Sequence, residues 1–125
     1  MSATAKAQSA YGTTTRTIKS PRDIEYELMA SITGRIQAAH GDTGPGAFPA
    51  LAAAMHDNRR LWSAFATDLA DNGNQFPKEL RARLFYLAEF VGQHTDKALS
   101  GAAPAEILVD INLAVMRGLR PQGGH

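Results

Sequence analysis

The chain has 125 residues, with 13 Lys and Arg against 12 Asp and Glu and a formal charge of +1. This length allows one domain with a modest core. The balanced charge argues against a dedicated nucleic-acid binder, which usually carries a clear basic excess. The absence of cysteine excludes disulfides, thiolate catalysis and thiolate metal sites, and it suits a reducing cytoplasm.

Residues 1–19 form an N-terminal arm of small and polar residues. The arm lacks the apolar run of a signal peptide, and no stretch of the chain is apolar enough to span a membrane, so we expect a soluble, cytoplasmic protein. Tyr11 and Ile18 are its large apolar residues, too few to offset the entropy of ordering the arm alone. Either Tyr11 docks on the rest of the protein, or the arm orders only with a partner.

The first predicted helix begins at Ser20 and Pro21, a favourable N-cap followed by a favourable first helical residue. It ends at Gly41, where the Gly/Pro-rich loop 41–49 follows. Its apolar positions recur every four residues, as in a helix with one buried face: Ile24, Leu28, Ile32 and Ile36.

Three further helices are predicted, over about 48–72, from Pro77 to Gly101, and from Pro104 to about Leu119. Their apolar stripes are Leu51, Met55, Trp62, Phe65 and Leu69; then Leu80, Leu84, Leu87, Val91 and Leu99; then Ile107, Leu108, Ile111, Val115 and Leu119. Alternating strand patterns are missing. The sequence therefore predicts an all-α, compact four-helix bundle over residues 20–120, preceded by a flexible or partly helical arm and followed by a disordered tail, 121–125.

No catalytic or metal-binding pattern stands out. The four His residues do not share helix faces, and the phosphate-loop, dinucleotide and hydrolase motifs are absent. Asp68 and Asp71, three residues apart, fit a solvated acidic stretch near a helix end better than paired catalytic carboxylates. We expect no enzyme, no metal and no cofactor.

Two asparagines fall on apolar stripes. Asn58 lies between Met55 and Trp62, and Asn112 lies between Leu108 and Val115. A buried amide must find hydrogen-bond partners or lower stability by about 1–3 kcal/mol. Either the two Asn tie helices together and fix their register, or one of them lines a groove and binds the backbone of a partner.

Basic residues cluster beside Trp62, at Arg59 and Arg60, and again at Arg81 and Arg83. Acidic residues share this neighbourhood and would repel phosphate: Asp57, Asp68, Asp71 and Glu79. We therefore expect a mixed-charge helix surface with intramolecular ion pairs.

Five blocks resemble, in order and spacing, the FlaF family of flagellar biosynthesis regulators: "AYG", "SPRDIEYEL", "HDNRRLWSAFATDLAD", "NQFPKELRARLFYLAEFV" and "DINLAVMRGL". The resemblance covers roughly residues 10–119. It implies a small helical protein needed for flagellin production and export. The partners that it implies are flagellin and possibly FlbT, a regulator of flagellin translation.

The implied function is a flagellin-binding secretion chaperone coupled to regulation of flagellin synthesis. Such a chaperone accepts an amphipathic segment in an apolar groove, where aromatic residues and Met dominate. The candidate groove residues are Trp62, Phe65, Phe90 and Met116, although all four also lie at core-like helical spacing. The full set of expected partner-binding residues adds Tyr11, Arg22, Asn58, Arg59, Asn112 and Arg117.

Two alternatives remain open. One is regulation of flagellin mRNA, in which Lys6, Arg16, Lys19 and Arg22 contact phosphates, although four cations support only weak, salt-dependent binding and we do not expect direct RNA binding. The other is an adaptor that binds FlbT alone.

Overall fold

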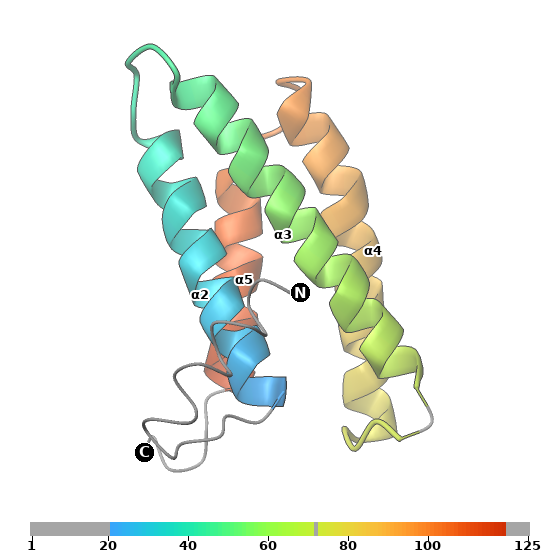
Figure 1. The fold of residues 1–125 in the computed structure, drawn as a ribbon. Coiled ribbons are helices and arrows are strands. Elements are labelled where there is room, and N and C mark those ends of the chain that lie inside the picture. The colour runs from blue at the N-terminus through green and yellow to red at the C-terminus, as the bar shows by residue number, and fades with distance from the viewer. Residues whose placement is uncertain (1–20, 72, 120–125) are drawn as a thin grey trace, which may run out of the picture.

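The computed structural model describes residues 21–71 and 73–119, and the side chains in these ranges apart from those of residues 21–24 and 119. This part of the chain folds into α2 (Pro21–His40), α3 (Ala47–Ala70), α4 (Lys78–Leu99) and α5 (Glu106–Leu119), with no strand among the described residues. Successive helices run in opposite directions, and short loops join them at the two ends of the bundle (Figure 1). The predicted all-α bundle is confirmed.

The helix ends lie close to the predicted positions. α2 begins at Pro21 and ends at His40, and the N–H of the following residue, Gly41, donates to the Gln37 carbonyl. The predicted loop 41–49 is shorter than expected, because α3 already begins at Ala47 and holds Pro49 in its first turn. A proline is tolerated there since the first helical N–H groups have no intrahelical acceptor. α5 begins two residues after Pro104.

The end of α4 depends on Gly101. Its φ is +82°, its N–H donates to the Ala98 carbonyl, and the Ala102 N–H donates to the Lys97 carbonyl at 2.8 Å. This pair of bonds is the Schellman motif, in which the residue after the cap adopts the left-handed conformation that glycine accepts without a steric penalty.

Gly101→Ala is expected to lower the free energy of unfolding by about 1–2 kcal/mol, because a Cβ disfavours the left-handed conformation. Gly92→Ala is the matched control. Gly92 lies inside α4, and a Cβ there meets nothing within 4 Å, so alanine should raise stability by about 0.5–1 kcal/mol. Urea denaturation of both variants measures the difference, and a shift of the same sign in both would contradict this account.

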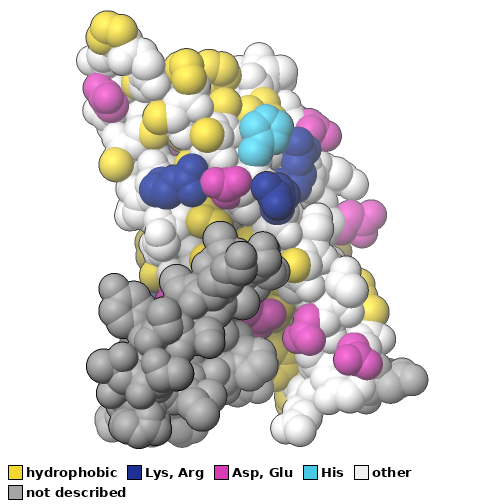
Figure 2. Space-filling model, viewed as in Figure 1, with side chains coloured by type: hydrophobic (Ala, Val, Ile, Leu, Met, Phe, Trp, Pro, Cys, Tyr) yellow, Lys and Arg dark blue, Asp and Glu magenta, His cyan; other side chains and the backbone are white. Residues whose placement is uncertain are grey.

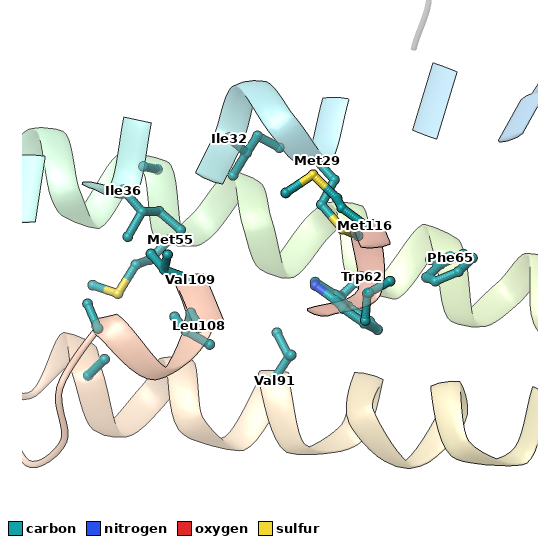
Figure 3. Close-up of a cluster of buried hydrophobic side chains, with 14 of the residues drawn as sticks. Met29, Ile32, Ile36, Met55, Trp62, Phe65, Val91, Leu108, Val109 and Met116 are labelled. Atoms are coloured by element: carbon teal, nitrogen blue, oxygen red, sulfur yellow. The ribbon is translucent and has the colours of Figure 1, made fainter. Parts of the chain in front are cut away.

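The hydrophobic core lies between α2, α3 and α5, and α4 closes one side (Figure 3). Its largest members are Met29 and Ile36 from α2, Met55, Trp62, Phe65 and Leu69 from α3, Val91 from α4 and Leu108 from α5. The predicted core position Leu80 is wrong, because this side chain is 37% exposed. It lies near the start of α4, and α4 packs closely on α3 but only sparsely on α5.

Candidate functional site

A buried polar network connects three helices through Asn112. The Asn112 amide donates to Asn58 Oδ1 at 2.7 Å and to Thr33 Oγ1 at 3.0 Å, while its Oδ1 accepts the indole N–H of Trp62 at 2.9 Å. Thr33 in turn donates to the Met29 carbonyl at 2.6 Å. α2, α3 and α5 each contribute at least one of these side chains, so the network fixes how the three helices are aligned.

The two asparagines are fully buried. Their hydrogen bond confirms the interpretation that they tie helices together, and their burial means that neither lines a surface groove in this conformation. The Asn58 Nδ2 group has no hydrogen-bond partner. Reversing the Asn58 amide would place this donor against the Asn112 donor, so the observed orientation is the better one of the two.

Three of the four candidate groove residues are also in the core. Trp62, Phe65 and Met116 are buried, and the rings of Trp62 and Phe65 meet edge to face with centroids 5.6 Å apart. In Figure 3 the Trp62 ring lies between α3 and the neighbouring helices and points inward. The expectation of an open groove lined by these three is therefore wrong for the packed bundle, because the neighbouring helices cover them.

The fourth candidate, Phe90, is 36% exposed on α4. Its ring stacks on His94, with centroids 5.4 Å apart and planes 24° from parallel. The His94 Nε2–H group donates to the Pro104 carbonyl at 2.8 Å, which places this flank of α4 next to the chain entering α5. Phe90 therefore lies at the partly open junction of α4 and α5.

The charged residues pair across helices. Arg59 on α3 forms an ion pair with Asp96 on α4, and Arg35 on α2 forms one with Asp57 on α3 at 2.8 Å. On the face shown in Figure 2, Lys and Arg side chains alternate with Asp and Glu in a band across the middle of the bundle. The predicted mixed-charge surface with intramolecular ion pairs is confirmed for Arg59.

The remaining expected partner-binding residues lie at the edges of the described structure. Arg117 is exposed in the last turn of α5. Tyr11 and the side chain of Arg22 lie outside the described residues, so their roles stay predictions.

The two acidic residues at the end of α3 shape the following turn. Asp71 is the C-cap residue, and its Oδ1 accepts the Gly73 N–H at 3.2 Å. Asn74 Nδ2 donates to the carbonyl of Asp68, and Asn74 Oδ1 accepts the Phe76 N–H at 2.9 Å. These contacts agree with the predicted role of Asp68 and Asp71 as exposed acidic residues near a helix end, where they stabilise the loop.

Within residues 21–71 and 73–119, no three His, Asp or Glu side chains gather into a possible metal site.

Comparison with known protein families matches residues 7–119 to the family described as flagellar protein FlaF. This chain belongs to the FlaF family. The match begins within the N-terminal arm and ends at the last residue of α5. No curated protein and no solved structure matches the chain.

The surface of this FlaF-family bundle has a hollow that was not predicted from the sequence. It is open, has a volume of about 450 Å³, and lies between α3 and α4. We call it the α3–α4 hollow; its lining residues are Ser63, Ala66, Phe85, Tyr86, Ala88 and Glu89. Phe85 is 42% exposed and Tyr86 is 70% exposed. The sequence could have indicated this surface, because Phe85 and Tyr86 are adjacent aromatic residues that lie outside the apolar stripe predicted to be buried.

None of the four described helices of this FlaF-family protein combines the length and apolar character needed to cross a membrane. Large exposed apolar side chains concentrate instead on α4, which carries Leu80, Phe85, Tyr86 and Phe90. Among the described residues, only Phe48 and Leu113 add to this set. α4 is therefore the helix with the most apolar surface available to a partner.

Proposed function

We propose that this FlaF-family protein is a non-enzymatic, cytoplasmic chaperone that binds flagellin before export and links that binding to the control of flagellin synthesis. The observation that carries the proposal is the family match over residues 7–119. The exposed apolar surface on α4 supports binding as the mode of action. The buried polar side chains of the bundle bond to one another and hold the helices together.

The α3–α4 hollow is the proposed docking surface. Phe85 and Tyr86 offer aromatic surface along one side, and the small residues Ser63 and Ala66 on α3 permit close approach of a second helix. Flagellin termini pair as amphipathic helices in the filament, and an amphipathic helix binds a hollow of this kind through its apolar face. Occupation of the hollow would cover the same flagellin face that drives assembly.

The charge arrangement favours a protein partner over RNA. Arg35 and Arg59 are each paired with an aspartate from a neighbouring helix, which reduces the positive potential available to phosphate. Regulation of flagellin mRNA, directly or through FlbT, is the alternative function. Co-purification from lysate with and without ribonuclease separates the two: flagellin retained after ribonuclease supports the chaperone, and loss of every partner supports RNA.

Phe85→Ala is expected to weaken flagellin binding at least about thirtyfold, because truncating an aromatic anchor at an interface commonly costs more than about 2 kcal/mol. Calorimetric titration of purified flagellin at about 50 and 200 mM salt measures this effect. Binding through apolar contact should change little with salt, whereas phosphate-driven binding falls by orders of magnitude over that range.

The matched control is Phe48→Ala. Phe48 is 57% exposed but lies at the first turn of α3, away from the hollow, so its truncation should leave affinity unchanged. Equal losses in the two variants would place the contact elsewhere. Affinity that collapses with salt and ignores Phe85→Ala would overturn the proposed docking surface.

A further inference from the structure

α4 is the least enclosed helix of the bundle. It packs along α3, meets α5 sparsely and makes no close backbone contact with α2. In Figure 1 it lies at the edge of the bundle, beside α3. No α4 side chain takes part in the Thr33–Asn58–Trp62–Asn112 network.

The flank of α4 that turns toward α5 carries a second apolar surface, separate from the α3–α4 hollow. Leu80, Leu87 and Phe90 share this flank with His94, whose bond to the Pro104 carbonyl marks the side on which α5 begins. Leu80 and Phe90 are each more than one-third exposed and Leu87 is half-buried. We call these three residues the α4–α5 seam.

The N-terminal segment has the length and the position to cover the seam. α2 begins at the same end of the bundle as α4, which is the lower end in Figure 1. Residues 7–20 come directly before α2, and in helical form these 14 residues would span about 21 Å. Leu80 and Phe90 lie about 15 Å apart along α4, so the segment is long enough to reach both.

The composition of the segment fits as well. Ala7, Ala10, Tyr11 and Ile18 follow a helical spacing of i, i+3, i+4 and i+11 and would share one face. Two small residues beside one aromatic allow close packing against large side chains such as Leu87 and Phe90. The FlaF match begins at residue 7, the first member of this stripe, so the stripe is part of the sequence that the chain shares with the family.

We propose that residues 7–20 fold back along α4 and cover the α4–α5 seam, with Tyr11 and Ile18 against Leu80, Leu87 and Phe90. This inference goes beyond the proposed function, because it concerns an intramolecular contact that needs no flagellin. It gives the two flanks of α4 different roles: one is covered by the protein itself, and the other, the α3–α4 hollow, stays open to a partner.

Limited trypsin digestion of the full chain tests the contact. Arg16 and Lys19 lie inside the segment, and the rate of cleavage after them increases with the fraction of molecules in which the segment is not docked on α4. Phe90→Ser is expected to speed cleavage after Arg16 at least about tenfold. Phe85→Ser is the matched control, because it makes the same residue change on the same helix at a side chain of similar exposure. Phe85 lies on the opposite flank, in the α3–α4 hollow, so the cleavage rate should not change.

Leu80→Ser provides a second disruption of the seam should Phe90→Ser impair folding, which thermal melting by circular dichroism reveals. Equal cleavage rates in the seam variants, the Phe85 variant and the unmodified protein would overturn the proposal. Cleavage of the unmodified segment as fast as that of a free peptide of the same sequence would overturn it too.

Cysteine pairing gives an independent readout, because the natural chain has no cysteine. A disulfide forms only when two Cα atoms come within about 7 Å. In dilute protein, Tyr11→Cys combined with Phe90→Cys is expected to oxidise to a monomeric cross-linked form, and Tyr11→Cys with Phe85→Cys is not. Equal yields from both pairs, or cross-linking only between molecules, would reject the intramolecular contact.

Discussion

Asn112→Leu is expected to lower the free energy of unfolding by about 2–6 kcal/mol. The substitution removes the acceptor of the Trp62 indole N–H and the donor to Asn58 Oδ1, and each group left buried without a partner costs about 1–3 kcal/mol. Thr33 also loses its bond from Asn112, at a smaller cost, because its hydroxyl still donates to the Met29 carbonyl. A loss of this size is a large fraction of a typical domain stability of about 5–15 kcal/mol.

Urea denaturation followed by the fluorescence of Trp62, the single tryptophan, measures this loss. Asp110→Leu is the control: it changes a polar residue to leucine on the same helix at an exposed position, and should alter stability by no more than about 0.5 kcal/mol. Asn58→Leu should cost less than Asn112→Leu, since the Asn112 amide keeps its bond to Thr33. A loss for Asn112→Leu as small as that for Asp110→Leu would contradict the hydrogen-bonded network.

Trp62→Ala is expected to lower stability by about 3–5 kcal/mol, the usual cost of truncating a large buried aromatic. The loss combines a cavity among core side chains with an unpaired Asn112 Oδ1. Trp62→Phe retains most of the ring and leaves only the acceptor unpaired, so it should cost about 1–3 kcal/mol. Urea denaturation by far-ultraviolet circular dichroism compares the variants without relying on tryptophan fluorescence.

Phe85→Ala serves as the control for aromatic truncation at an exposed site, and a change within about 0.5 kcal/mol is expected. If Trp62→Ala were no more destabilising than Phe85→Ala, Trp62 would not belong to the core. Equal losses for Trp62→Ala and Trp62→Phe would assign the whole effect to the indole N–H and none to packing.

Much of the fold was predictable because its signals are local. Pro21, Gly41 and Gly101 mark helix ends through backbone geometry that depends on a few neighbouring residues. The burial of Thr33 and Thr95 was not predicted. Each hydroxyl donates to the carbonyl four residues earlier, at 2.6 Å in both cases, which satisfies it within its own helix and lets it face the core.

The candidate site was less predictable because exposure depends on neighbouring helices. Leu80 and Leu84 have the same residue type and lie one turn apart, yet Leu84 is buried and Leu80 is not. Leu80 lies in the first turn of α4, and α5 packs only sparsely against this helix. The apolar pattern of α4 alone does not show which of its leucines a neighbouring helix covers. Trp62 and Phe90 were both candidate groove residues at core-like helical spacing, and only the packed bundle shows that Trp62 is buried and Phe90 is 36% exposed.

The network around Asn112 joins parts of the chain that are synthesised at very different times. Thr33 and Asn112 are 79 positions apart, and Asn58 and Asn112 are 54 apart. During translation, α2 and α3 are therefore synthesised well before the residue that aligns them, and until then the Trp62 indole N–H and Asn58 Oδ1 lack their Asn112 partner. The bundle reaches its final register only when its last helix is made, so a chain that stops before α5 cannot complete it.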